Sequence, residues 1–230
     1  MVKIRKSAER GQGTFDWLDS RHTFSFADYF DPKHMGFRAL RVINEDRIAP
    51  GSGFPSHPHR EMEIITYVLE GAVEHKDSLG TGSVITVGEI QRMSAGTGIV
   101  HSEFNHSPRE PLHLLQIWIL PNEKGIAPGY EQRRFDREAA RGRFLELAGP
   151  AGTGCVTIHS DARLMMTTLD AGKGAELALE HDHAWIQVAR GAVMLGGNSL
   201  ESGDGAAITN ERTIRLQAAK PAEILLFDLA

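Results

Sequence analysis

Short apolar runs, and runs that alternate apolar and polar residues, recur along the whole chain with Gly, Pro, Asn and Asp between them. Runs of this length and pattern predict β-strands. We expect the strands at residues 37–43, 62–69, 72–75, 83–87, 112–120, 155–159, 164–169, 175–179, 185–189, 206–208, 213–216 and 224–229. Helical periodicity is weak, and one helix is expected at 136–141 with Asp136 as its N-cap. Many short strands with tight turns predict an all-β fold of sandwiches or jelly-roll barrels.

The same pattern contains a faint internal repeat. An H-x-H pair, an apolar strand and a Gly-Ala-Val turn occur once in His57–Val73 and again in His181–Val193. The second histidine precedes the glycine by twelve positions in the first copy and by eight in the second, so the match is loose. We expect two jelly-roll barrel domains in tandem, at residues 1–135 and 136–230. The connection between them is expected within residues 121–154, which are rich in Gly, Pro and charge.

Composition narrows the class of protein. The 230 residues are 41% hydrophobic and 24% charged, which is ordinary for a globular protein long enough to bury a substantial core. The net charge is −5, and no block of Lys or Arg is long enough for a nucleic-acid patch. Cys155 is the only cysteine, so an intrachain disulfide is excluded. No apolar stretch resembles a signal peptide or a membrane span, and we expect a soluble, cytoplasmic protein.

Two short clusters carry the candidate chemistry. His57 and His59 form one pair, and His101 and Glu103 form another; in each pair the residues are two positions apart. Residues i and i+2 of a β-strand point to the same face, so each pair can present two donor groups side by side. Brought together inside one barrel, three imidazoles and a carboxylate predict a site for a transition metal.

The residues alone leave two questions open. Glu63 has the same parity as His57 and His59, so periodicity cannot choose between Glu63 and Glu103 as the carboxylate ligand. A metal that prefers five or six ligands would keep open positions for substrate or dioxygen, whereas a tetrahedral zinc ion held by four protein ligands would be inert. The mixed nitrogen and oxygen donors suit Fe, Ni, Co, Cu, Mn or Zn, and ligand type does not select among them.

The spacing of these clusters resembles the two sequence motifs of the cupin superfamily. The first reads Gly51-x5-His57-x-His59-x3-Glu63-x7-Gly71, and the second reads Gly96-x-Gly98-x2-His101-x3-Asn105. Within that superfamily the chain is most similar to the pirin family, and in particular to bacterial pirin-like quercetinases. The segments that carry this resemblance are Trp17–Ser20, His22–Phe26, His57–Arg60, Met93–Glu103 and Leu114–Trp118. The resemblance is clear over residues 1–135 and weak beyond them.

The resemblance implies a bicupin with one divalent metal in the N-terminal domain and a degenerate C-terminal domain. Its ligands would be His57, His59, His101 and Glu103, which favours Glu103 over Glu63. Iron is the favoured metal, with Zn, Cu, Ni, Co and Mn as alternatives. The implied reaction is the cleavage of a flavonol such as quercetin by O2 at its 2,3 bond, with release of carbon monoxide. Glu103 is the expected catalytic base, because a ligand carboxylate lies within reach of any group bound to the metal.

The sequence is also compatible with other functions. Pirins of higher organisms act as iron-dependent partners of transcription regulators, so a non-enzymatic protein partner is the main alternative to a flavonol-like aromatic substrate. Another cupin activity, such as an isomerase, is a third. Glu63 would be a residue behind the ligands or near the substrate, or a purely structural one. No role is expected for His75, His106 and His113. His181 and His183 lack the partner donors for a second metal site.

Overall fold

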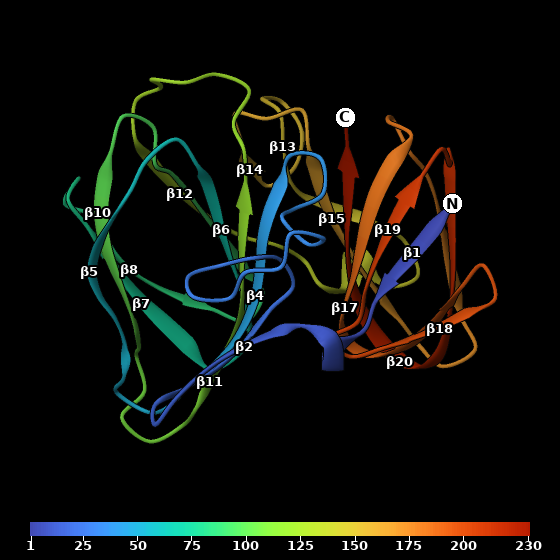
Figure 1. Ribbon diagram of the computed structural model, residues 1–230, viewed down its shortest axis with the longest axis horizontal. Coiled ribbons are helices and arrows are strands. Elements are labelled where there is room, and N and C mark those ends of the chain that lie inside the picture. Colours follow the sequence, from blue (N-terminus) through green and yellow to red (C-terminus); the bar gives the residue numbers. More distant parts are fainter.

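Two β-barrels lie side by side in the protein (Figure 1). The computed structural model describes residues 1–230. The first barrel is made of a seven-stranded and a four-stranded sheet that face each other, and the second is made from one nine-stranded sheet. All paired strands except one short pair are antiparallel. The predicted all-β fold with two barrels is therefore confirmed, and most of the expected strands are present.

The seven-stranded sheet occupies the middle of the molecule in Figure 1. In spatial order it consists of β12 (Gly129–Arg134), β9 (Glu89–Ser94), β6 (Glu63–Glu70), β11 (Leu112–Ile119), β4 (Leu40–Ile48), β3 (Leu18–His22) and β2 (Gly11–Phe15). The four-stranded sheet forms the outer wall of the same barrel. In order it consists of β5 (Gly53–His59), β10 (Ile99–Asn105), β7 (Ala72–Asp77) and β8 (Gly82–Thr86).

The nine-stranded sheet closes into the second barrel. Its main path runs through β1 (Val2–Arg5), β19 (Gly205–Thr209), β17 (His183–Leu195), β20 (Thr213–Leu229), β15 (Arg163–Leu169), β13 (Leu145–Gly149) and β14 (Val156–Thr157). Two further strands pair with β20 and β17, namely β16 (Gly174–Ala178) and β18 (Asn198–Glu201). The strands expected at 213–216 and 224–229 are one long strand, β20, whose pairing with β17 is irregular around Arg190 and Ala192.

The helix expected at residues 136–141 is wrong. The structure has a single 3-10 turn there, η2 (Glu138–Ala140), as it has near the start of the chain at η1 (Ser7–Glu9). Asp136 still accepts a hydrogen bond at 3.0 Å from the backbone N–H of Glu138. The turn is held by i to i+3 bonds and stops before Gly142, whose φ of +72° does not continue a right-handed helix.

The chain passes between the barrels twice. β1 pairs with β19 of the second barrel, with Val2 opposite Ile208, before the chain enters the first barrel at β2. It returns between β12, which belongs to the first barrel, and β13, which belongs to the second. The predicted boundary at 135/136 falls in this second passage. We retain it as a proposal.

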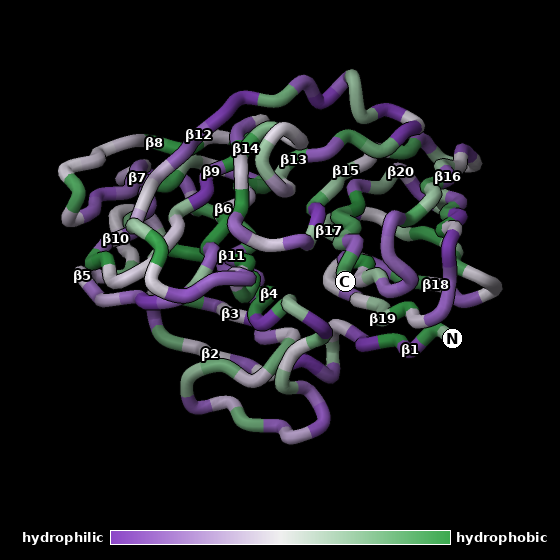
Figure 2. Tube along the Cα trace, turned by 90° about the horizontal axis from the view of Figure 1, so that it is seen from above, coloured by the Kyte–Doolittle hydropathy of each residue, from purple (hydrophilic) through white to green (hydrophobic).

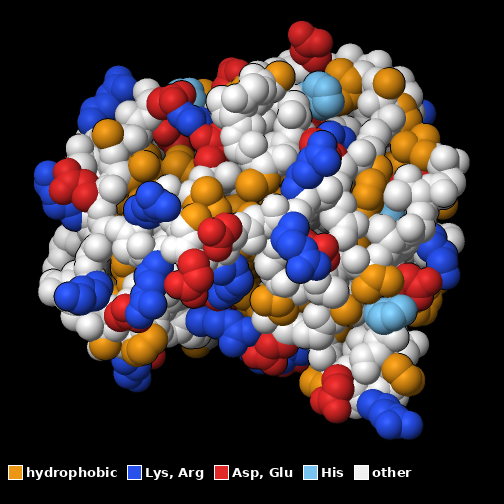
Figure 3. All heavy atoms as spheres, turned by 180° about the vertical axis from the view of Figure 1, so that it is seen from behind, with side chains coloured by type: hydrophobic (Ala, Val, Ile, Leu, Met, Phe, Trp, Pro, Cys, Tyr) orange, Lys and Arg blue, Asp and Glu red, His pale blue; other side chains and the backbone are white.

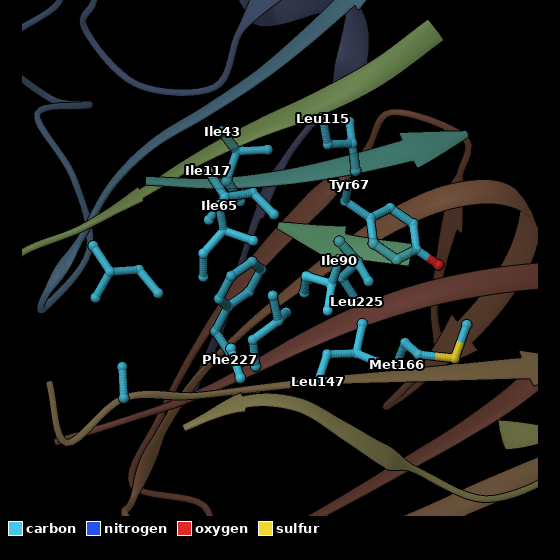
Figure 4. Packing of buried hydrophobic residues seen from close by; sticks show 14 of the residues in the cluster. Ile43, Ile65, Tyr67, Ile90, Leu115, Ile117, Leu147, Met166, Leu225 and Phe227 are labelled. Atoms are coloured by element: carbon cyan, nitrogen blue, oxygen red, sulfur yellow. The ribbon is translucent and has the colours of Figure 1, made fainter. Parts of the chain in front are cut away.

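The largest apolar cluster lies between the barrels and not inside either of them. The outward side chains of the seven-stranded sheet pack there against the second barrel (Figure 4). The labelled residues of this cluster are Ile43, Ile65, Tyr67, Ile90, Leu115, Ile117, Leu147, Met166, Leu225 and Phe227. Coloured by hydropathy, the chain is most apolar where β4, β6, β11 and β17 approach one another (Figure 2). On the face seen in Figure 3, basic and acidic side chains are interspersed.

The two barrel interiors differ in kind. A cluster of 18 buried apolar residues occupies the interior of the second barrel. The first barrel has only two small interior clusters, of 7 and 4 buried residues, one containing Leu114 and the other Ile64. Between them the inward positions of the strands are polar, as at Thr66, Asn44 and Gln116. Any chemistry inside a barrel is therefore expected in the first one.

The internal repeat corresponds to two equivalent bends. Gly71 and Gly191 have φ angles of +78° and +77°, a conformation that favours glycine. At both positions an added Cβ would collide with a proline carbonyl oxygen, that of Pro111 at Gly71 and that of Pro221 at Gly191. The bends meet at the interface, because Arg190 donates a hydrogen bond to the Leu69 carbonyl at 2.8 Å and lies 3.1 Å from the Glu70 carboxylate.

Candidate metal centre

Three of the predicted site residues converge at the pairing of β5 with β10. The register places His101 opposite His57, and Ile99 opposite His59. The ring centroids are 4.5 Å apart for His57 and His101, 4.8 Å for His59 and His101, and 4.7 Å for His57 and His59. One nitrogen from each ring lies within 4.8 Å of the other two, which is close enough for all three to hold one ion.

The hydrogen bond that His57 makes defines its tautomer. Its Nδ1 lies 2.7 Å from the Pro55 carbonyl oxygen, which can only accept, so Nδ1 carries the proton and donates. The Nε2 lone pair is then free, and it points at Nε2 of His101 over 3.1 Å. Fixing one ring nitrogen as a donor and leaving the other as a metal donor is how proteins orient ligand imidazoles. These residues therefore fit a transition metal.

Burial keeps two of the three imidazoles neutral. It lowers the pKa of His101 to about 2, and the neighbouring His57 and His59 add to the effect. It also lowers the pKa of His59 to about 4, again assisted by His57. A histidine binds a metal only in its neutral form, so at neutral pH these two rings are already in the form that binds.

Glu103 follows His101 on the same strand but occupies the inner side of the centre. Its buried carboxylate accepts hydrogen bonds from Thr66 Oγ1 at 3.1 Å and from Gln116 Nε2 at 2.6 Å. Burial raises the pKa of Glu103 to about 7. The pairing of β10 with β5 is irregular between His101 and Glu103. The Glu103 carboxylate lies within metal-ligand distance of His101 and His75, but not of all three clustered imidazoles. The structure thus brings the predicted histidines together and places Glu103 beside one of them.

His75, for which no role was expected, lies directly behind His101. The two Nδ1 atoms are 3.4 Å apart, and His75 Nε2 is 3.0 Å from the Asp77 carboxylate. The side chains of His75 and Asp77 are fully buried, and the Tyr130 ring stacks on His75. Asp77 thus holds the proton on His75 Nε2, which leaves His75 Nδ1 to accept from His101. The signal in the sequence is an H-x-D pair on β7, but it has meaning only once β7 is paired with β10.

Glu63 does not face the centre. It starts β6 and shares the outward face of that strand with Ile65 and Tyr67, so its parity with His57 is lost across the turn between β5 and β6. Its carboxylate accepts a hydrogen bond from Ser94 Oγ at 2.9 Å and lies 3.4 Å from His159 Nδ1. Glu63 therefore belongs to the contacts between the barrels.

The histidines of the second half do not form a matching cluster. His181 pairs with the buried Asp228 carboxylate of β20 at 3.1 Å, and His183 lies next to Asp182. The two groups of residues that have metal-ligand geometry both lie in the first barrel. Of the other histidines, His113 pairs with Glu45 at 3.0 Å, and His106 is largely exposed.

A cavity of about 390 Å³ opens beside the three histidines, within the usual size range of small-molecule sites. The rings of Phe26, Phe54 and Trp118 form apolar walls, and Trp118 packs edge-on against His59 at 4.9 Å. Polar side chains from β3, β4, β10 and β11 close the inner end. No helix of the structure has the length and hydropathy needed to cross a bilayer.

Two barrels in tandem, with a histidine cluster in the first, define a bicupin. Residues 3–119 match the Pirin family, and residues 147–229 match the family described as Quercetinase C-terminal cupin domain. The chain therefore belongs to the pirin family. It is 52% identical to a quercetin 2,3-dioxygenase of Escherichia coli K12 over 231 residues, which cover 100% of this chain and 99% of that one. A putative quercetin 2,3-dioxygenase of Pseudomonas aeruginosa is 43% identical over the full length of both chains.

Solved structures agree with this membership. The crystal structure of YhhW from Escherichia coli matches with a TM-score of 0.95 at 49% identity, and covers 100% of this chain and 98% of that one. A second structure, of the bacterial pirin YhhW in complex with nickel(II), matches with a TM-score of 0.94 at 49% identity and covers 100% and 99% of the two chains. The predicted family and the bicupin fold are both confirmed.

Proposed function

We propose that this protein is a metal-dependent flavonol 2,3-dioxygenase of the quercetinase type. The observation that carries the proposal is the convergence of three imidazoles at the wall of an aromatic-lined cavity. The names of the full-length relatives support the same activity. The proposed ligands are His57, His59, His101 and Glu103.

The proposed site holds one divalent metal in the first barrel. The nickel(II) found in the related pirin supports a divalent ion at this place, and it makes nickel a candidate equal to the iron that we expected. The mixed donors are compatible with both. When bound, the metal supplies the Lewis acidity that polarises the flavonol oxygens and opens the substrate to attack by O2.

The residues of the chain perform the remaining tasks. Glu103, whose carboxylate lies beside His101 and whose pKa is raised by burial in the metal-free protein, takes the proton of the flavonol 3-hydroxyl. Thr66 and Gln116 donate hydrogen bonds to Glu103 and so hold its two oxygens in place. His75 and Asp77 fix the orientation of His101 from behind. The aromatic walls exclude water and keep the planar substrate beside the histidines.

The proposed reaction consumes one flavonol and one O2. The bonds from C3 to C2 and C4 break, C3 leaves as carbon monoxide, and the two oxygen atoms are distributed so that a phenolic ester of a benzoic acid remains. The substrate partners are therefore a flavonol-like aromatic molecule and dioxygen.

The test is to load the metal-free protein separately with Fe(II), Ni(II), Co(II), Mn(II), Cu(II) and Zn(II) and to add quercetin. We expect at least one metal to give loss of the flavonol absorbance, O2 uptake and carbon monoxide in equal amounts. His59→Ala is the matched control and should bind less metal and turn over no quercetin. Tight binding of zinc without turnover by any of the six metals would support the inert structural site instead.

A further inference from the structure

A row of polar side chains crosses the inside of the first barrel. The strand registers place His22 opposite Asn44, Asn44 opposite Gln116, Gln116 opposite Thr66, and Thr66 opposite Gln91. All five side chains are buried. Such a row replaces the apolar residues that would otherwise join the two small clusters at the ends of this interior. Buried polar residues cost stability unless they are hydrogen-bonded, and such costs are typical of functional sites.

Several polar atoms of this interior have no partner within the protein. Buried polar atoms in native structures are nearly always hydrogen-bonded. Here His22 Nδ1, Asn44 Oδ1, Gln116 Oε1 and Trp118 Nε1 have none, and all four residues line the cavity. The exposed fractions of His22, Asn44 and Gln116 are only 6%, 3% and 9%. Each of these cavity-lining side chains therefore carries a hydrogen-bonding atom that the protein itself does not satisfy.

Asp46 adds a carboxylate to the same end of the cavity. It is 3% exposed, lines the cavity, and accepts a hydrogen bond from Ser20 Oγ. The oxygens of Asp46, Asn44 and Gln116 are acceptors, so they require hydrogen-bond donors on the ligand. No Lys or Arg lines the cavity, which disfavours an anionic ligand group there.

The walls define the rest of the ligand. Phe26 lies edge-on to Trp118 at 5.3 Å and to His22 at 5.2 Å, so these rings frame one face of the cavity. Aromatic walls favour a flat aromatic ring. A flat ring that also carries neutral O–H donors is a phenol.

We propose that Asp46, Asn44 and His22 bind the phenolic hydroxyls of a substrate ring that does not touch the metal, which makes them specificity-determining residues. The natural substrate is then a polyhydroxylated aromatic molecule that contacts both the histidine cluster and Asp46, which line the same cavity. This inference rests on the proposed function, because it assumes that the metal-facing end of the cavity receives the flavonol oxygens.

The test compares two flavonols that share the metal-facing oxygens. Quercetin carries further phenolic hydroxyls on both of its outer rings, and 3-hydroxyflavone carries none. Asn44→Leu removes the unpartnered acceptor and keeps the volume, and Asp46→Asn removes the carboxylate charge. We expect each variant to weaken quercetin binding about tenfold, which corresponds to about 1.4 kcal/mol, and to change 3-hydroxyflavone binding less than twofold. Binding is measured by quenching of tryptophan fluorescence in the metal-loaded protein, and the KM values are measured beside it.

Gln91→Leu is the matched control, because Gln91 belongs to the same row and has unpartnered atoms but does not line the cavity. It should leave the affinity for both flavonols unchanged. Circular dichroism and metal content establish that each variant is folded and loaded. Equal losses for the two flavonols, or no loss for quercetin, would overturn the inference. Selective binding of quercetin without turnover by any metal would support the hydroxyl pocket and reject the proposed dioxygenase.

Discussion

At the scale of single residues, burial acts in opposite directions on the acids and bases of the centre. It raises the pKa values of Glu103 to about 7 and of Asp46 to about 6, and it lowers those of His59 to about 4 and of His101 to about 2. Every one of these shifts favours the neutral form. At neutral pH His59 and His101 are therefore in the neutral form that binds a metal, whereas Glu103 and Asp46 lose their protons close to neutral pH.

The two glutamates should respond differently to the same substitution. Glu103→Gln removes a proposed ligand and base, so we expect metal affinity to fall more than the 10–100-fold typical of changes behind a ligand, and flavonol turnover to stop. Glu63→Gln changes a contact with His159 on the side of the second barrel and should retain metal and turnover. Isothermal titration with the active metal and an O2 electrode measure both. The opposite pattern would make Glu63 the ligand.

His75 is expected to act through His101. His75→Gln removes the ring that accepts from His101 Nδ1, so metal affinity should fall by roughly 10–100-fold although His75 is not a proposed ligand. His106→Gln is the control, since His106 is largely exposed and far less constrained. The metal affinity and, for a Ni(II) or Co(II) form, the visible spectrum are measured. An unchanged spectrum and an unchanged metal affinity would show that the contact with His75 does not orient His101.

Asp46 should make the stability of the metal-free protein depend on pH. Its folded-state pKa is raised from 3.8 to about 6, so the folded protein holds the proton more tightly than the unfolded chain does. The resulting stability is present below pH 4 and is lost as the pH rises through 6. The Asp46→Asn variant has no carboxyl group to ionise here and does not lose this stability. The difference in unfolding free energy between the variant and the wild type should therefore shift by about 2–3 kcal/mol in favour of the variant from pH 4 to pH 7. Urea unfolding of both proteins across this range, with a chelator present, measures the difference; a constant difference would contradict it.

The residues of the candidate site that could be predicted are those whose positions follow from their spacing within one strand. His57, His59 and His101 could be identified because each lies on a strand where alternate residues share a face. Glu63 was ambiguous because parity does not survive a turn, and here Glu61 at φ +52° sends the chain into a different sheet. His75 could not be found, since its contact with His101 depends on the pairing of β7 with β10.

At the scale of elements, strands with apolar faces were predictable and strands with polar or glycine-rich sequences were not. β6 and β11 were expected almost to the residue, whereas β2 and β12 were missed. β12 reads Gly-Tyr-Glu-Gln-Arg-Arg, and it exists because it pairs with β9 along its whole length. Tertiary pairing thus overrides weak local preference at the edge of a sheet.

The histidine pair at the start of β17 should be dispensable for metal binding. His181 is already paired with Asp228 of β20, and the neighbouring interior is apolar. The double variant His181→Ala with His183→Ala should therefore keep one metal per chain and normal flavonol turnover. Metal analysis by mass spectrometry after gel filtration measures the stoichiometry. Loss of one equivalent from a protein that binds two would overturn the single-site proposal.

At the scale of the whole molecule, the two barrels share their largest apolar core. Phe227 is fully buried among residues of both barrels, so Phe227→Ala should cost about 3–5 kcal/mol of unfolding free energy. Because the cluster joins the barrels, we expect both to lose stability together. Hydrogen exchange followed by mass spectrometry measures this on peptides from β6 and β11 and from β15 and β17. Faster exchange in the second barrel alone would show that the barrels unfold independently.

The pairing of β1 with β19 also has a consequence for how the chain is made. Val2 and Ile208 are partners although 206 positions separate them. At ribosomal speeds of about 5–20 residues per second, β1 waits roughly ten to forty seconds for its partner strand to be synthesised. The first barrel, from β2 to β12, can close during that interval, while β1 trails from it as an unpaired strand. The first strand to be translated is thus among the last to pair. Its pairing joins the first barrel, which has already folded, to the second barrel, which has just been synthesised.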